Sequence, residues 1–247
     1  MENNTIFREI YAEVFHKNGL DVYVTDAYIE KFEQLTRIML ETNAVMNITA
    51  LTTLEKIIPL HYADCVAVAP HIPANSTVID IGCGGGFPIL PLAIVRPDLR
   101  ILGVDSTEKK VKYVQKAADT LGLQVKTLSA RAEELGRDSA YRETYDVAIS
   151  RAVARMNVLD ELALPLVRKG GLFVAMKGAA GREEMQEAAN GCARLGGTAY
   201  DVLDYPLHTC EVSEARTLLL VQKTAATPAE FPRAFGNIKK KPLQGRI

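Results

Sequence analysis

A glycine-rich turn at residues 82–86 restricts the possible fold of this chain more than any other feature. The apolar run Val78–Ile81 comes directly before it and predicts a buried strand. Phe87 and Pro88 follow it, and proline is tolerated where a helix begins because the N–H at that position has no helical partner. Glycines let the backbone approach a ligand closely. The segment therefore predicts a strand, a tight turn and a helix around a bound small molecule.

The spacing of the glycines indicates which nucleotide is bound. A dinucleotide turn has the pattern G-x-G-x-x-G, but its third glycine would fall at position 87, which is Phe, and no P-loop Lys-Ser/Thr follows. Asp80 would also repel a pyrophosphate, by on the order of 1 kcal/mol at a few ångströms. A carboxylate at the mouth suits the cationic sulfonium and ammonium of S-adenosylmethionine. The pattern therefore predicts the cofactor loop of a class I methyltransferase, with Asp80, Gly82 and Gly84 as binding residues.

Strand-like and helix-like segments alternate after residue 76, which is typical of a doubly wound, mostly parallel sheet. The predicted strands are Val78–Ile81, Ile101–Val104, Val125–Leu128, Val147–Ile149 and Leu172–Met176, with helices at 88–95, 108–121, 131–137 and 156–168. After a helical segment at 182–195, the runs Tyr200–Tyr205 and Thr217–Gln222 are joined by a long connection without helical pattern. They predict an antiparallel pair at the sheet edge.

The first 75 residues have helical periodicity instead. Their apolar positions include Ile6, Ile10 and Val14, then Phe32, Leu35 and Ile38 after a cap at Thr25 or Asp26, and a third helical segment runs from about Leu54 to Ala69. We therefore predict two parts: an N-terminal helical extension, 1–75, packed on the main domain, and a class I methyltransferase (Rossmann-like) domain, 76–247. The basic tail from Pro228 onward is expected to be mostly irregular.

Two further turns at the same sheet edge predict cofactor contacts. Asp105 ends the second strand, where a carboxylate can accept both ribose hydroxyls. Its alternative role is to cap the helix that starts near Thr107. Ala132 and Glu133 follow the third strand, where class I methyltransferases place the adenine. The alternative for Glu133 is that an acidic residue simply favours a helix N-terminus.

The residues after the fourth strand are expected to face the methyl acceptor. They lack the Asn/Asp-Pro-Pro motif of amine methylation, and no cysteine follows proline as C5 methylation requires. An acceptor that needs no deprotonation, such as guanine N7, remains, so catalysis would consist of positioning and electrostatics without a general base. Arg151 is predicted to bind the cofactor, an RNA phosphate or the substrate base. For Arg151 and Arg155 the alternative is a structural salt bridge.

Composition excludes several other classes of protein. With 29 basic and 30 acidic residues the net charge is −1, so RNA binding would need a local patch. The cysteines form no C-x-x-C pair, and we predict no metal site and no disulfides. No signal peptide and no apolar run near ~20 residues is evident, so we expect a cytoplasmic protein without a membrane span.

Several blocks together resemble one family. They are Met46–Thr49, His61–Asp64, the glycine loop with Phe87-Pro88, Asp105-Ser106 followed by Lys109–Val111, Arg131–Glu133, Asp146–Ala154 with Ser150–Ala152, Lys177-Gly178, and the tail from Phe231 to Leu243. The chain resembles the bacterial 16S rRNA guanine-N7 methyltransferases, the glucose-inhibited division protein B family. It departs from the family pattern at Cys65, Ile89 and Phe231, none of which is an expected cofactor position.

The resemblance implies methyl transfer from S-adenosylmethionine to N7 of a guanine in the position 527 loop of 16S rRNA. It also implies cofactor contacts at Gly82, Phe87, Ala132, Glu133 and Arg151. Partners would be 16S rRNA or the 30S subunit, with the protein acting as a monomer. A small-molecule methyltransferase, and a non-catalytic ribosome-associated protein that retains the cofactor, stay open as alternatives.

The RNA hypothesis gives the basic residues a role. Those predicted to bind RNA are Arg155, Lys177, Arg233, Lys239, Lys240 and Lys241, and Arg246 adds a further tail charge. A solvated flexible tail is the alternative. His61 and Asp64 are left undecided between bonding each other, fixing the N-terminal helices and contacting substrate. We also predict that Arg151→Ala impairs activity far more than folding.

Overall fold

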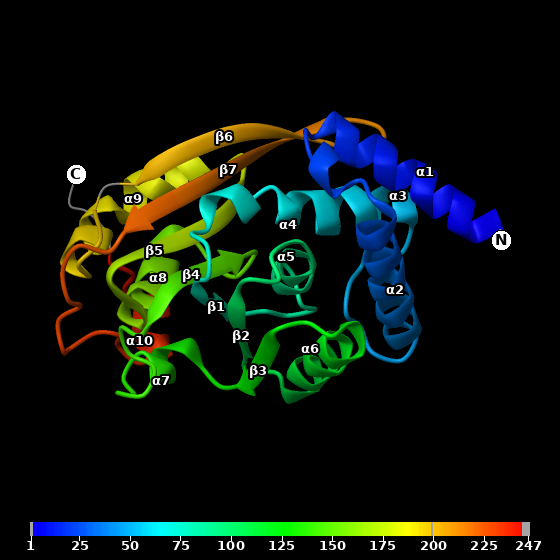
Figure 1. The fold of residues 1–247 in the computed structure, drawn as a ribbon. Coiled ribbons are helices and arrows are strands. Elements are labelled where there is room, and N and C mark those ends of the chain that lie inside the picture. Colours follow the sequence, from blue (N-terminus) through cyan, green and yellow to red (C-terminus); the bar gives the residue numbers. More distant parts are fainter. Residues whose placement is uncertain (1, 199, 244–247) are drawn as a thin grey trace.

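The computed structural model describes residues 2–198 and 200–243, which form a seven-stranded sheet with helices on both faces (Figure 1). The strands are β1 (Thr77–Ile81), β2 (Arg100–Asp105), β3 (Val125–Ser129), β4 (Tyr145–Arg151), β5 (Val167–Gly178), β6 (Asp201–His208) and β7 (Ser213–Gln222). Their order is β3-β2-β1-β4-β5-β7-β6, with β1 to β5 parallel and β7 antiparallel to both neighbours. The predicted α/β class and sheet are confirmed.

The two C-terminal strands are longer than predicted, and the long connection expected between them is wrong. β6 continues through Pro206 to His208, so only residues 209–212 join it to β7. Since β6 is an edge strand, the missing N–H of Pro206 removes no central ladder bond. The predicted helix over 156–168 is also too long. α8 ends at Ala163, and Pro165 lies in a 3₁₀ turn before β5 begins.

The remaining helices of the main domain cover both faces of the sheet. They are α5 (Ile89–Val95), α6 (Glu108–Leu121), α7 (Ala132–Leu135), α9 (Gly181–Arg194) and α10 (Phe235–Lys240). The short helix α10 is the one regular element in the described part of the tail, residues 228–243, so the tail is mostly irregular as expected. Its Ile238 is fully buried in the same cluster as α8 side chains, which explains why so short a segment is helical.

The N-terminal part contains α1 (Glu2–Lys17), α2 (Asp26–Asn43), α3 (Leu54–Ile57) and α4 (Asp64–Val66), with two 3₁₀ turns, Asp21–Tyr23 and Ala69–His71. The third predicted helix is interrupted by a π-helical turn, Ile58–Ala63, where Asp64 N–H bonds to the Pro59 carbonyl. Pro59 has no N–H with which to continue the α-helical ladder, so the turn widens at this point.

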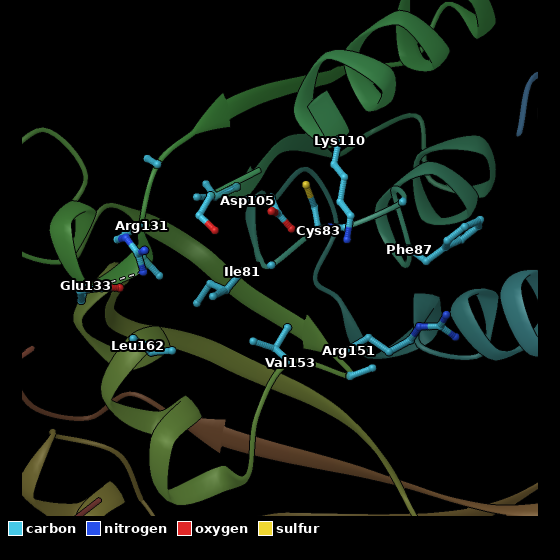
Figure 2. A pocket seen from close by; sticks show the side chains of 18 of the residues that line it. Ile81, Cys83, Phe87, Asp105, Lys110, Arg131, Glu133, Arg151, Val153 and Leu162 are labelled. Atoms are coloured by element: carbon cyan, nitrogen blue, oxygen red, sulfur yellow. Dashed lines mark hydrogen bonds and ion pairs between the residues drawn. The ribbon is translucent and has the colours of Figure 1, made fainter. Parts of the chain in front are cut away.

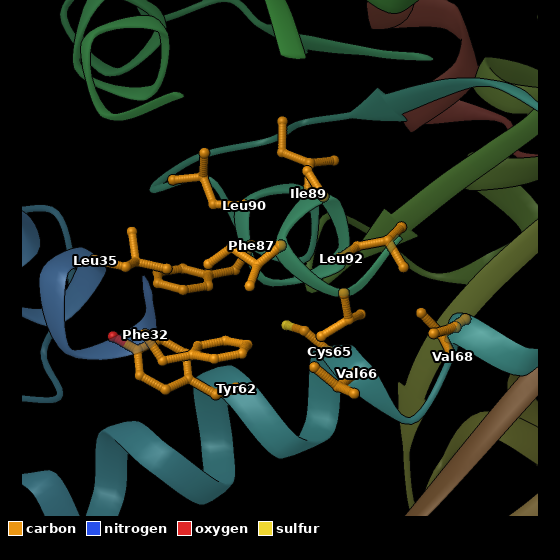
Figure 3. Packing of buried hydrophobic residues seen from close by; sticks show 14 of the residues in the cluster. Phe32, Leu35, Tyr62, Cys65, Val66, Val68, Phe87, Ile89, Leu90 and Leu92 are labelled. Atoms are coloured by element: carbon orange, nitrogen blue, oxygen red, sulfur yellow. The ribbon is translucent and has the colours of Figure 1, made fainter. Parts of the chain in front are cut away.

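Alternate residues of the central strands enter two different buried clusters, as the period of a strand requires. Val78, Val147 and Val174 pack with α1 to α6, whereas Ile79, Ala148 and Phe173 pack with α7 to α10. Figure 3 shows part of the first cluster, which brings together Phe32 and Leu35 of α2, Tyr62, Phe87, and Leu90 of α5. The N-terminal helices therefore share a core with one face of the sheet. The boundary at residue 75 stays a prediction.

Residues 2–198 and 200–243 contain neither a candidate membrane-spanning helix nor a candidate metal site. No helix there is long and apolar enough to cross a membrane. No group of three or more His, Cys, Asp or Glu side chains there could hold a metal ion. Cys65, Cys83, Cys192 and Cys210 are free thiols.

Candidate functional site

A cavity of about 430 Å³ lies at the carboxyl ends of β1, β2 and β4 (Figure 2). Because β1 lies between β2 and β4, this is the point where the strand order reverses, and open α/β sheets bind their ligands there. The volume is within the range of small-molecule sites, about 300–1,000 Å³. The lining includes Gly82, Gly84, Phe87, Asp105, Ala132, Glu133 and Arg151. Seven of the eight residues expected to bind the cofactor therefore meet in one cavity.

The glycine loop is bent sharply toward the end of β2. Gly82 and Gly84 have φ values of +74° and +51°, a region that glycine adopts without steric cost. The N–H groups of Gly82 and Cys83 donate to the Val104 carbonyl at 2.8 and 2.9 Å. A Cβ at Gly82 would lie 2.6 Å from Val153 Cγ2, which also lines the cavity. The loop thus forms a close-fitting cradle that side chains at these positions would fill.

Asp105 fixes the second wall of the cavity. Its Oδ2 accepts the Gly84 N–H at 3.0 Å, and its Oδ1 accepts the Thr107 N–H at 2.8 Å. One oxygen therefore holds the glycine loop and the other the residue before α6, whereas a contact of Asp105 with the ribose stays a prediction. The carboxylate also lines the cavity opposite Glu133 (Figure 2).

Ala132 and Glu133 form the far end of the cavity at the start of α7. Glu133 is buried, with Arg131 the nearest cation at 3.9 Å. A carboxylate beside the first N–H groups of a helix is also favoured by the helix dipole. The two interpretations of Glu133 are compatible, and its contact with the cofactor stays a prediction.

Asp80 is not where the sequence placed it. The expectation of a carboxylate at the mouth is wrong, because Asp80 is 0% exposed and does not line the cavity. Neither carboxylate oxygen has a hydrogen-bond partner among the described residues. Burial raises the pKa of Asp80 well above its usual range, against the opposing effect of Arg151. The period of the strand explains this position, since Asp80 points into the face covered by α5.

Arg151 connects the sheet to the π-helical turn. Its guanidinium donates to the Leu60 carbonyl and to Asp64 Oδ2, both at 2.7 Å, and to His61 Nδ1 at 3.0 Å. Arg216 of β7 donates to the other oxygen of Asp64 at 3.1 Å. His61 and Asp64 therefore both bond Arg151, which fixes the N-terminal helices to the sheet. The salt bridge considered as the alternative for Arg151 is present, although the side chain still lines the cavity.

His61 is held in one neutral form. Arg151 has only donors, so Nδ1 of His61 accepts and Nε2 carries the proton that bonds Thr49 Oγ1 at 2.7 Å. Burial and the Arg151 charge lower the pKa of His61 to about 3. Its ring stacks on Phe87 with centroids 4.1 Å apart. A neutral ring therefore supports the Phe87 side of the cavity.

The residues predicted to bind RNA differ in their availability. Arg155 pairs with Glu183 and Glu187, the salt-bridge alternative considered for it. Lys177 is only 9% exposed and pairs with Glu184. Arg233 bonds the fully buried Glu161 at 2.8 Å through Nε. Lys239, Lys240 and Lys241 are exposed at the end of α10. Arg246 lies outside the described residues. RNA binding by these residues stays a prediction.

Some lining residues were not singled out from the sequence. They are Ile48, Lys110, Leu162 and Phe235, and the sequence did not distinguish among the possible roles of His61. Ile48, His61, Lys110 and Phe235 fall within the blocks that resemble the family, and this resemblance was the available signal for them. Phe235 reaches the cavity on α10, and nothing in the tail's composition indicated a helix there.

The sequence is similar to one family of proteins. The family model described as rRNA small subunit methyltransferase G matches residues 28–207. The protein named ribosomal RNA small subunit methyltransferase G from Leuconostoc citreum is 38% identical over 92% of this chain and 95% of its own length. The proteins of that name from Brevibacillus brevis, 37% identical over 96% and 99%, and from Deinococcus deserti, 40% over 91% and 91%, are similar throughout.

Solved structures share the fold at low sequence identity. A SAM-dependent O-methyltransferase from Thermotoga maritima superposes with a TM-score of 0.53 and 13% identity, covering 77% of this chain and 72% of that one. A geranyl diphosphate C-methyltransferase from Streptomyces coelicolor, solved with S-adenosyl-L-homocysteine, has a TM-score of 0.50 and 14% identity over 66% and 79%. These likenesses show the class I methyltransferase fold.

Proposed function

Because this chain belongs to the family of rRNA small subunit methyltransferase G, we propose that it transfers a methyl group from S-adenosylmethionine to N7 of a guanine in the 527 loop of 16S rRNA. The observation that carries the proposal is the cavity at the strand-order reversal, which collects the glycine loop, Asp105 and Glu133 in a chain related to this family over nearly its whole length. The protein would act as a monomer in the cytoplasm, on 16S rRNA or the 30S subunit.

The cavity fits this cofactor by its shape and its donors and acceptors. The bent backbone at Gly82 and Gly84 would accept the methionine part, and the carboxylates of Asp105 and Glu133 would accept hydrogen bonds from the ribose and the base. When bound, the cofactor supplies a methyl group on a cationic sulfur. Guanine N7 has a free lone pair, so the protein needs to orient the base and exclude water but not to remove a proton.

The direct test is transfer of labelled methyl from the cofactor to small subunits isolated from a strain that lacks the gene. We expect stoichiometric labelling at one guanine in the 527 loop, mapped as N7-methylguanine, with naked 16S rRNA measured in parallel. Methylation of this guanine that is unchanged in the deletion strain, or labelling of free metabolites but not of small subunits, would contradict the proposal.

The three exposed lysines at the end of α10, Lys239 to Lys241, should contribute to RNA affinity through phosphate contacts. Changing Lys239, Lys240 and Lys241 together to glutamine should reduce the slope of log Kd against log salt by about 2–3, since each contact contributes ~0.7–0.9. Filter binding to 16S rRNA at several salt concentrations measures this slope. The matched control changes Lys31, Lys116 and Lys126, three exposed lysines on other elements, and should leave the slope unaltered. Equal slopes for both triple variants would refute the role of the tail.

A further inference from the structure

A second cavity of about 620 Å³ adjoins the cofactor cavity. The two share His61, Arg151, Ala152 and Val153, so a single wall separates them. The second cavity continues past this wall to the carboxyl end of β5, to α9 and to β7. Enzymes that modify a base hold it in a pocket beside the reacting group and recognise its hydrogen-bonding edge. The second cavity is in the appropriate place for an acceptor base.

Three carboxylates line this second cavity, and they differ in what they can still bind. Both oxygens of Asp64 are bonded, one to Arg151 and one to Arg216. Glu214 pairs with Arg216 and has a side chain that is 41% exposed, so water competes for it. Glu184 is only 14% exposed, and its Oε2 accepts from Lys177 Nζ at 2.7 Å and from the Met156 N–H at 3.1 Å. Its Oε1 accepts no hydrogen bond from residues 2–198 and 200–243, and Arg155 is a further cation that interacts electrostatically with this carboxylate.

Lys177 complements Glu184 on the same side of the cavity. Its ammonium donates to the Ala154 carbonyl at 2.6 Å and to Glu184, which uses two of its three N–H groups. The pair therefore offers one free N–H donor next to one free carboxylate oxygen, both held in place by other bonds. Ala154 follows the shared wall directly in sequence, so the ammonium lies close to the wall.

The edge of guanine has the complementary pattern. Its O6 is an acceptor and the neighbouring N1–H is a donor, whereas adenine has an amino group and an unprotonated N1 at these positions. Adenine also has a nucleophilic N7, so a lone pair at N7 does not distinguish the two bases. The groups on the Watson–Crick edge differ between the two bases, and a site that pairs with O6 and N1–H leaves adenine with unmatched polar groups.

We propose that Lys177 and Glu184 form the specificity pair of the acceptor-base pocket, with Lys177 donating to guanine O6 and Glu184 accepting from guanine N1–H. The inference rests on the proposed function and names the residues that recognise its substrate. In the reaction, the N7 lone pair forms the new N–C bond while the S–C bond breaks and its electron pair stays on sulfur. The positive charge moves from sulfur to the base, and no proton is transferred. Neither member of the pair is a catalytic base.

The test compares Glu184→Gln with wild type on small subunits whose target position carries guanosine, inosine or adenosine. Inosine keeps O6 and N1–H, so wild type should methylate guanosine and inosine and reject adenosine. In the variant, the single amide oxygen is occupied by Lys177 and Met156, so the NH₂ group faces the base. We expect kcat/KM for guanosine to fall about 10- to 100-fold and the preference over adenosine to fall with it.

Two companion variants separate recognition from structure. Glu183→Gln, on the same helix but with a side chain that is 70% exposed, should behave as wild type. Lys177→Met should lower kcat/KM for guanosine and inosine equally, since both rely on O6. Affinity for S-adenosylhomocysteine, measured by calorimetry, should be unchanged in each variant. A Glu184→Gln enzyme with wild-type kcat/KM and base preference would overturn the proposal.

If the proposed methyl transfer to 16S rRNA were wrong, the experiments would give a different result. Wild type would then methylate none of these subunits, and the pocket is tested by binding instead. With S-adenosylhomocysteine saturating the cofactor cavity, wild type should bind guanosine monophosphate at least tenfold more tightly than adenosine monophosphate, and Glu184→Gln should not. Equal affinities for the two nucleotides in wild type would refute the specificity pair irrespective of the reaction.

Discussion

Replacing Arg151 with alanine should lower the free energy of unfolding by about 3–5 kcal/mol and reduce methyl transfer at least 100-fold. The substitution leaves the Leu60 carbonyl, His61 Nδ1 and one oxygen of the buried Asp64 without their donor. Removing one partner of a buried ion pair has a cost of this size because the other charge remains buried. The sequence alone had predicted a loss mainly of activity. The network makes a large loss of stability equally expected.

Urea denaturation measures the first effect and labelled methyl transfer below the unfolding transition the second. Arg168→Ala is the matched control, since Arg168 pairs with Asp146 on the surface and should contribute less than about 1 kcal/mol. Arg151→Lys keeps the charge but not the planar fork of donors, and should recover part of the stability only. An Arg151→Ala protein as stable as the Arg168→Ala control would show that the network does not hold the N-terminal helices.

Replacing Gly82 with alanine should weaken cofactor binding about 100-fold or more. The residue has a φ of +74°, which costs an alanine about 1–2 kcal/mol. The added Cβ would also lie 2.6 Å from Val153 Cγ2, which is closer than real Cβ contacts allow. Relief requires movement of the loop or of Val153, and both line the site. Calorimetric titration with S-adenosylhomocysteine measures the loss.

The variant Gly122→Ala separates the cost of the positive φ from the cost of the steric contact with Val153. Gly122 ends α6 with a φ of +65°, and a Cβ there would meet nothing within 4 Å. This control should therefore lose similar stability while binding the cofactor as wild type does. If the Gly82→Ala protein binds the cofactor as tightly as the Gly122→Ala protein, the loop does not form the cofactor site.

The local patterns of the sequence were sufficient for the sheet and the glycine loop. Buried strands such as Val147–Ile149 are continuous apolar runs, and a glycine turn between strand and helix is visible in a few neighbouring residues. The strand order and the meeting of Asp105 with Glu133 then follow from the rules of doubly wound sheets. These parts depend on short stretches of chain.

The parts that could not be predicted depend on residues far apart in the chain. Arg216 reaches Asp64, and Arg151 reaches Asp64 and His61, across a fold that no local pattern describes. The role proposed for the free oxygen of Glu184 likewise depends on the bond between its other oxygen and Lys177, which the sequence does not show. Asp80 was misplaced because its position in the motif indicates a role but not the direction of its side chain.

The docked tail has a consequence for local unfolding. Arg233 supplies the backbone and side-chain donors to Glu161, whose side chain is fully buried, and Phe235 follows as a wall of the cofactor cavity. If the tail detached, the buried Glu161 carboxylate would lose its cation and remain in an apolar environment. Opening of this segment is therefore opposed electrostatically as well as by the loss of packing at Ile238. Because Phe235 belongs to this segment, a truncation that removes the segment would also remove part of the cofactor cavity's lining.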